Sequence, residues 1–275
     1  MNILIIKSLF IPNKKYLDIN LNNLSDLNDK FGNFYDLFLI GWVDSYQNEL
    51  SKFISNKLIF RSVKIKIYDN NCGKYKIYND IIDIAKQDNE HDYYIYFDHD
   101  IMLENNITHK IMPICKLLDN KIDGTNIGLI LFNQTGDIRH KIDIYDNNDI
   151  IDNISICWSS NIYSMTCCAF ITKKIYFAIL SHLELISVYG FDDTSLIKGF
   201  SDMNLKTVIT KDISIYHPFN YDKKYNEWKN KIIEMIATKQ LKSYKDSLKD
   251  FNKNLFYCEE SFHDLITHES HEMFS

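Results

Sequence analysis

The stretch Tyr93-Tyr94-Ile95-Tyr96-Phe97-Asp98-His99-Asp100 joins an apolar run to an acidic triplet. Its first five residues are typical of a buried β-strand. Residues two apart in a strand share a face, so Asp98 and Asp100 can converge where the strand leaves the sheet. Adjacent carboxylates repel each other, and Mg²⁺ or Mn²⁺ relieves the repulsion by binding their oxygens. The triplet therefore indicates either a metal site or a solvated acidic turn, with His99 as a spacer that points away from both aspartates.

Apolar runs before this stretch predict further strands of the same sheet. Three of them occupy Asn2–Lys7, Asp36–Trp42 and Val63–Tyr68, and apolar residues recur at helical spacing over 17–31 and 78–85. Alternating strands and helices are typical of βαβ units with a mainly parallel sheet, whose strands are buried on both faces. Ligands of such sheets bind beyond the carboxyl ends of the strands, which is where the acidic triplet would lie.

The second half of the chain has a less regular pattern. Apolar runs over Ile127–Phe132 and Met165–Thr172 predict strands, and the residues from Lys174 to about Ser187 predict a helix. The C-terminal part is rich in lysine and has helical character. We therefore expect one α/β domain and a C-terminal helical extension that packs on it. Their expected extents are residues 1–220 and residues 221–275.

Composition restricts the class of protein. The chain has 275 residues, of which 45% are hydrophobic and 14% aromatic, so it can bury a large core and is not a disordered chain. The formal net charge is -6 and the lysines alternate with acidic residues, which argues against nucleic acid as a partner. The six cysteines form no C-x-x-C pair, so they are expected to be reduced thiols rather than zinc ligands.

The sequence also predicts where the protein works. No apolar segment approaches the roughly 20 residues that span a bilayer. The first apolar run, Ile3–Ile6, lacks the basic flank and the small-residue cleavage site of a signal peptide. We expect a cytoplasmic protein without a transmembrane segment. The abundance of Lys, Ile and Asn indicates an AT-rich genome, such as that of a virus or a microbe.

Two later segments carry polar groups that could join the triplet. Asp192 and Asp193 lie where a helix could begin, and carboxylates there either cap the helix or take part in a reaction. A strand-like run over 212–216 ends at His217, which precedes a proline. A lone histidine is more often a structural residue than a ligand. Its combination with the two acidic pairs makes a functional role for His217 worth considering.

Taken in order, these pieces resemble the motifs of GT-A glycosyltransferases, particularly the family 2-like group of nucleotide-sugar enzymes. YIYFDHDI resembles the Asp-X-Asp element that binds metal, and YGFDDTSLIKGF resembles the later acidic element. NNCGKYKIYND is similar to the glycine-containing segment before the donor-site helix, and IYHP resembles the late histidine of the family. The resemblance covers about residues 1–220.

The resemblance implies a GT-A (Rossmann-like) α/β fold with a mixed, mainly parallel central sheet flanked by helices. It implies metal-dependent transfer of a sugar from a nucleoside-diphosphate donor, a UDP-sugar, to a hydroxyl group of a glycan, a protein or a small molecule, with inversion at the anomeric carbon. The metal would be Mn²⁺ or Mg²⁺. The implied residues are the metal ligands Asp98, Asp100 and His217; the donor contacts Ser8, Asp44, Asn71, Asn79 and Asp98; the bases Asp193 and Asp192; and the acceptor contact Trp158.

Two of these roles involve a choice between candidates. Asp193 is favoured over Asp192 as the base because helix capping would more naturally occupy Asp192. Of Trp42, Trp158 and Trp228, Trp158 is preferred as the acceptor platform because it lies in the polar stretch before the acceptor-side strand. Trp42 ends a buried strand and is expected to pack in the core.

Two other functions fit parts of the same pattern. A metal-dependent nucleotidyltransferase also places acidic pairs on a nucleotide-binding α/β sheet, but it would usually bring a glycine-rich phosphate loop. The chain has only 8 glycines and no G-x-G-x-x-G or P-loop arrangement. A module that binds a nucleotide-sugar without turnover is the non-enzymatic alternative, although both acidic pairs and the histidine are present.

Overall fold

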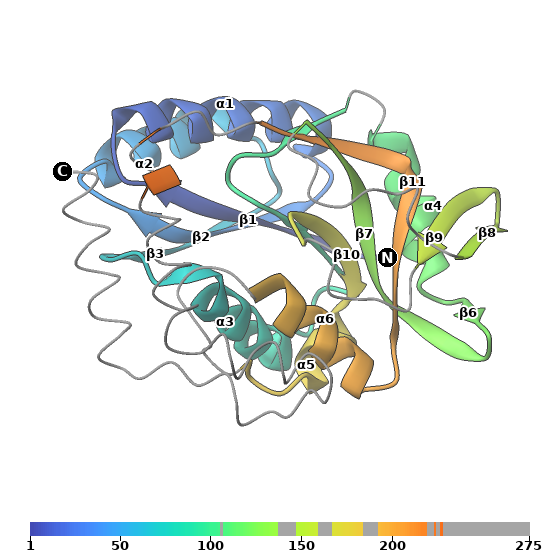
Figure 1. Cartoon of the computed structure of the whole chain (residues 1–275). Coiled ribbons are helices and arrows are strands. Elements are labelled where there is room, and N and C mark those ends of the chain that lie inside the picture. The colour runs from blue at the N-terminus through green and yellow to red at the C-terminus, as the bar shows by residue number, and fades with distance from the viewer. Residues whose placement is uncertain are drawn as a thin grey trace.

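The computed structural model describes residues 1–104, 107–136, 147–158, 167–183 and 192–218, together with Lys223, Asn226 and Glu227. These residues form one mixed β-sheet with helices on both faces, which is an α/β fold (Figure 1). The predicted helical extension lies outside the described residues, apart from the three isolated ones. Within the described part of the chain, no helix is both long and apolar enough to cross a membrane.

An 11-stranded sheet forms the centre of the molecule, and its main path has the order β3-β2-β1-β4-β10-β7-β11-β9-β8. The first half of this path is parallel, with β1 paired to both β2 and β4 and with β2 paired to β3. After β4 the strands alternate in direction, except that β11 runs parallel to β7. The sheet is therefore parallel in the half that the βαβ pattern predicted and mixed in the other half.

The strands on the main path are β1 (Ile3–Ile11), β2 (Asp36–Val43), β3 (Val63–Tyr68), β4 (Tyr93–Phe97), β7 (Thr125–Gly136), β8 (Asn147–Ile151), β9 (Ile154–Trp158), β10 (Ala169–Lys173) and β11 (Lys206–His217). Two short strands lie off this path: β5 (Met102–Leu103) pairs with β11, and β6 (Lys121–Ile122) pairs with β7.

The helices lie in two layers (Figure 1). One layer contains α1 (Lys14–Phe31), α2 (Gln47–Lys57) and α4 (Ile107–Leu117), and the other contains α3 (Gly73–Gln87), α5 (Lys174–Ile179) and α6 (Asp192–Asp202). Two separate groups of buried apolar side chains join these layers to opposite faces of the sheet. The helical spacing of apolar residues in α1 and α3 is explained by this burial, because one stripe of each helix faces the sheet.

The structure confirms the predicted strands of the parallel half and corrects one helix. The helix expected from Lys174 to about Ser187 ends at Ile179, where Leu180 adopts an extended conformation (φ -64°, ψ 134°). The side chain of Asn79 then holds the following segment, because its Nδ2 donates to the Leu183 carbonyl (3.0 Å) and its Oδ1 accepts from the Leu183 N–H (2.7 Å). The two side-chain bonds take the place of the main-chain bonds that a longer helix would make.

Candidate active site at the carboxyl ends of the strands

The acidic triplet leaves the sheet directly after β4. The Asp98 N–H donates to the Cys168 carbonyl (2.8 Å), and the Asp98 carbonyl accepts a hydrogen bond from Nζ of the buried Lys7 on β1. Lys7 lies beside Phe97 in the pairing of β1 with β4, which brings its ammonium to this turn. Both main-chain groups of Asp98 are therefore bonded, its N–H to the Cys168 carbonyl and its carbonyl to the Lys7 side chain, which fixes the position of Asp98.

The carboxylate of Asp98 is only 5% exposed and has three side-chain partners. Its Oδ1 accepts from the Tyr96 hydroxyl (2.8 Å) and from the Ser8 hydroxyl (3.4 Å), and its Oδ2 lies 2.7 Å from Lys74 Nζ. Ser8, a predicted donor contact, is thus part of the support of Asp98. Both oxygens of a predicted metal ligand are already occupied by protein groups.

Lys74 connects the two acidic pairs that the sequence singled out. Besides Asp98, its Nζ lies 3.2 Å from Asp193 Oδ1 and 3.6 Å from Asp192 Oδ2. Burial alone would lower the pKa of Lys74, but the charges of Asp193 and Asp98 raise it well above its ordinary value. This ammonium therefore stays protonated and holds three carboxylates around it.

The local sequence explains why Lys74 reaches this place. It occupies the first turn of α3, directly after Gly73, whose φ of 67° is a left-handed conformation that glycine adopts without strain. The Asn71 side chain accepts from the Gly73 N–H (3.2 Å) and so supports this turn. Asn71, predicted as a donor contact, thus supports the turn that presents Lys74.

Asp192 and Asp193 begin α6, as the sequence predicted. Asp193 Oδ1 accepts from Lys74 and from the Tyr78 hydroxyl (3.4 Å), which comes from α3. Burial and the neighbouring charge of Asp193 raise the pKa of Asp192 well above the ordinary carboxyl range, against the charge of Lys74. Two adjacent carboxyl groups with different surroundings are the arrangement in which one can act as a base.

Asp100 lies on the other side of the triplet and faces two histidines. Its Oδ2 lies 3.6 Å from His217 Nε2, at the end of β11, and 3.7 Å from His99 Nε2. His99 therefore does not point away as expected, because the strand ends at Phe97 and the following residues turn. Burial would raise the pKa of Asp100, but His99, His217 and the lysines lower it to about 2.

The three predicted metal ligands do not form a ready metal site in this arrangement. Asp98 turns its oxygens to Lys74, Tyr96 and Ser8, whereas Asp100 pairs with His217. Among the residues that the structure describes, no group of three or more His, Cys, Asp or Glu side chains is arranged to hold a metal ion. One atom nevertheless lacks a bond: Asp100 Oδ1 is buried and has no hydrogen-bond partner among the described residues.

Two further predicted donor contacts lie near the same edge of the sheet. The Asp44 N–H donates to the Ile11 carbonyl (2.9 Å), so Asp44 follows β2 at the carboxyl end of β1, and its carboxylate accepts from Ser45 (3.3 Å). Asn79 is half-buried on α3 and, as described above, both groups of its side chain bind the backbone of Leu183. Asn79 therefore has a structural role in this arrangement.

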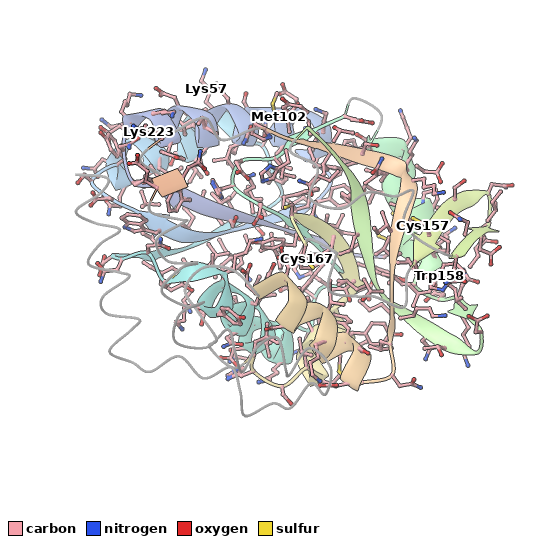
Figure 2. All side chains as sticks on the ribbon, viewed as in Figure 1. Lys57, Met102, Cys157, Trp158, Cys167 and Lys223 are labelled. Atoms are coloured by element: carbon pink, nitrogen blue, oxygen red, sulfur yellow. The ribbon has the colours of Figure 1, made fainter. Side chains whose placement is uncertain are left out.

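Trp158 is not brought to this cluster. Lys206 Nζ lies 5.1 Å from the centre of the Trp158 ring. Lys206 is the first residue of the 12-residue strand β11 and His217 is the last, so at about 3.3 Å per residue they are on the order of 30 Å apart. Figure 2 shows Trp158, the last residue of β9, toward the edge of the molecule, whereas Cys167, whose thiol contacts the Asp193 carbonyl, lies near its centre.

The lysines and tyrosines of the site were missed in the sequence. Lys7 is a charged residue within an otherwise apolar run, and a buried charge in a strand needs a specific partner. Lys74 follows the glycine of the motif NNCGKYKIYND, which also carries Tyr78. The position of Lys7 inside a buried strand was therefore a signal that the sequence offered. Nothing in the local sequence distinguishes Lys74 from the many surface lysines.

Comparisons with known proteins place this geometry in a known fold. No protein-family model matches the chain, and no curated protein sequence matches it significantly. The solved structure of S. aureus TarS 1-349 is similar to it, with a TM-score of 0.51 and 15% sequence identity over 98% of this chain and 70% of that chain. The same TarS 1-349 in complex with UDP-GlcNAc has a TM-score of 0.51 and 16% identity over 98% of this chain and 71% of that one.

A longer TarS structure gives the same result. Its TM-score is 0.52 at 15% identity, and the alignment covers 98% of this chain but only 42% of that one. This chain therefore spans less than half of the length of that protein. The likeness shows the fold alone, which is a GT-A-like mixed α/β fold with a central sheet flanked by helices.

Proposed function

We propose that the protein is a glycosyltransferase that transfers a sugar from a nucleoside-diphosphate donor, a UDP-sugar, to a hydroxyl acceptor. The observation that carries this proposal is the cluster of two buried carboxyl groups, Asp98 and Asp192, and the half-buried Asp193 around Lys74, at the edge of the sheet where α/β folds bind ligands. Two of the similar TarS structures are complexes with UDP and with UDP-GlcNAc, which supports the choice of donor.

Departure of the diphosphate requires positive groups, and deprotonation of the acceptor hydroxyl requires a carboxylate. The cluster contains both kinds of group. A departing nucleoside diphosphate gains negative charge, which fixed positive groups stabilise. Lys7 and Lys74 are such groups: burial lowers the pKa of Lys7, but only to about 8, so both carry a charge at neutral pH. The acceptor hydroxyl is a weak nucleophile and needs a carboxylate to take its proton.

Asp192 suits the role of that base better than Asp193, which the sequence favoured. A general base works best when its pKa is close to the working pH, and burial beside Asp193 raises the pKa of Asp192 in that direction. Asp193 is instead held by Lys74 and Tyr78. With Asp192 as the base, displacement occurs in one step and inverts the anomeric carbon.

No step of this scheme depends on a metal ion, because both oxygens of Asp98 are engaged by Lys74, Tyr96 and Ser8. When bound, Mn²⁺ or Mg²⁺ would act as a Lewis acid on the leaving diphosphate. The requirement for a metal at Asp98, Asp100 and His217 stays a prediction of the sequence. The assay below tests it directly.

The proposal is tested with a panel of UDP-sugars and GDP-sugars, scored for nucleotide release in the presence of mixed hydroxyl acceptors. We expect release from a UDP-sugar and its loss in Asp192→Asn. The matched control is Asp202→Asn, at the exposed end of the same helix, which should keep the activity. The panel is run with Mn²⁺ and with chelator, and the anomeric configuration of the product is read by NMR.

Each outcome of this assay separates the alternatives. Binding of UDP-sugar without release or transfer to any acceptor would indicate a binding module. Pyrophosphate formed from a nucleoside triphosphate and a sugar phosphate would indicate a nucleotidyltransferase. A product with retained configuration would remove the proposed role of Asp192 as the base.

A further inference from the structure

Lys74 places a positive charge between the two acidic motifs, and it contacts Asp98, one of the three predicted metal ligands. Its Nζ lies 2.7 Å from Asp98, 3.2 Å from Asp193 and 3.6 Å from Asp192, so one positive charge touches carboxylates from both acidic motifs. Carboxylates from separate elements that converge on one point usually do so around a cation. Here the cation is an ammonium that belongs to the chain itself.

The fold holds this ammonium in place through more than its ion pairs. Lys74 projects from the first turn of α3, and the hydroxyl of Tyr75, the next residue, lies 3.0 Å from Ser195 Oγ on α6. The same two helices are also joined by the bond from Tyr78 to Asp193. These bonds fix α3, which carries Lys74, against α6, which carries Asp192 and Asp193, so a metal ion that approaches Asp98 Oδ2 would meet the ammonium there.

The cluster has fewer ammonium groups than carboxyl groups. The four carboxyl groups of the two motifs face two ammonium groups, Lys7 and Lys74, and Lys7 points to the Asp98 carbonyl. Asp100 Oδ1 remains buried without a hydrogen-bond partner among the described residues. Lys74 therefore already supplies a cation at Asp98. The oxygen without a partner belongs to Asp100, whose other oxygen lies near His217.

We infer that Lys74 is the built-in counter-cation of this site and binds the diphosphate of the nucleotide donor without a divalent metal ion. This inference rests on the proposed function and identifies the group that holds the donor. An ammonium has three N–H donors, and Lys74 lies within hydrogen-bond distance of two carboxylates, those of Asp98 and Asp193, with Asp192 farther away at 3.6 Å. Diphosphate oxygens would take over some of these bonds, while Asp98 keeps its bonds from Tyr96 and Ser8.

The test is calorimetric titration of the full chain with UDP, in chelator and then in Mn²⁺. We expect UDP to bind wild-type protein with an affinity that changes less than about threefold on chelation. Lys74→Met should weaken binding in chelator by more than about tenfold, and Lys74→Arg should retain more affinity because it keeps the charge. Lys76→Met is the control, since Lys76 is on the same helix but pairs with Asp80.

A second readout follows Mn²⁺ itself, by the electron paramagnetic resonance signal of the free ion. Removal of the ammonium frees the oxygens of Asp98, Asp192 and Asp193, so Lys74→Met should bind Mn²⁺ at least about tenfold more tightly than wild type. Bound Mn²⁺ should then restore the UDP affinity of this variant. Neither measurement depends on turnover.

Three results separate failure of this inference from failure of the proposed function. UDP binding by wild-type protein that is lost on chelation would overturn the inference and leave the glycosyltransferase proposal standing, even if the variants do not fold. Tighter Mn²⁺ binding by wild type than by Lys74→Met would also overturn it. The absence of UDP or UDP-sugar binding under every condition would count against the proposed function itself.

Discussion

Buried charged side chains gather at both ends of the parallel strands, but the two groups are balanced differently. At the amino ends, His91 lies between two carboxylates, 3.0 Å from Asp36 Oδ2 and 2.9 Å from Asp88 Oδ2. Arg61 also pairs with Asp36 (2.5 Å), and the Tyr94 hydroxyl donates to Asp88 (2.7 Å). We call this group, with Ser62, the amino-end cluster.

The group at the carboxyl ends, which contains Lys7, Lys74 and the two acidic motifs, has more acids than bases and one buried oxygen without a partner among the described residues. The carboxyl-end cluster also contains carboxyl groups whose pKa values are shifted in opposite directions, because the pKa of Asp100 is lowered and that of Asp192 is raised. Burial would raise the pKa of Asp36 and of Asp88, but their hydrogen bonds lower both, whereas the pKa of Asp192 is raised. A satisfied buried network stabilises a fold, and an unbalanced one is typical of a reaction site.

The largest expected effect is the loss of transferase activity when a carboxyl group of the carboxyl-end cluster is changed. Asp192→Asn should reduce transfer by about 10²- to 10⁴-fold, the usual contribution of a general base. Its melting temperature should be unchanged or higher, because the substitution removes a buried carboxylate whose charged form is disfavoured. Steady-state kinetics and thermal unfolding of the same preparation measure both quantities. A stable variant with full activity would show that Asp192 is not the base.

The amino-end cluster should show the reverse behaviour. His91→Leu leaves Asp36 and Asp88 without their shared partner, which should lower the free energy of unfolding by about 3 kcal/mol. His182→Leu is the control: this histidine pairs with Asp83 on the surface, with side-chain exposures of 51% and 47%, and should change stability by less than about 1 kcal/mol. Urea unfolding measures both variants, and equal losses would show that burial of the His91 network contributes nothing.

The contribution of Asp192 to stability should depend on pH with the opposite sign to the contributions of Asp36 and Asp88. Asp36 and Asp88 have lowered pKa values, so their contribution is present above the ordinary carboxyl pKa of about 4 and is lost as the pH falls through their lowered values. Asp192 has a raised pKa, so its contribution is present at low pH and is lost as the pH rises through the raised value.

Urea unfolding as a function of pH checks these signs. The stability gained in Asp192→Asn should grow as the pH rises above about 4. His91→Leu should weaken the loss of stability on acidification below that pH. A gain in Asp192→Asn that is independent of pH would contradict the raised pKa.

The smallest expected effect concerns the residue that the sequence placed in the site and the structure does not. Trp158→Ala should change the acceptor KM by less than about twofold, or about 0.4 kcal/mol, because Trp158 lies at the opposite end of β11 from His217. Stability should fall by about 1–2 kcal/mol, because the variant loses both the contact with Lys206 and the packing of a half-buried ring against the core. A large rise in the acceptor KM would return Trp158 to the acceptor site.

The sequence alone determined the elements that carry the site. An apolar run ending at Phe97, a helix beginning at Asp192 and a strand ending at His217 are all present where the pattern predicted them. Burial of one face or stripe leaves a periodic signal that can be read along the chain. The same signal predicted the parallel half of the sheet, whereas the alternating half and the early end of α5 depend on contacts with distant segments.

Only the tertiary structure decided which charges meet. Lys74 and Asp193 are 119 residues apart in the sequence, and Lys7 and Asp98 are 91 apart. The pairing of strands and the packing of α3 against α6 bring them together. Tertiary packing also carried Trp158 away from the cluster that its position in the sequence suggested. Periodicity encodes which face of an element is buried, but the partner of a buried charge is set by the assembly of the whole sheet.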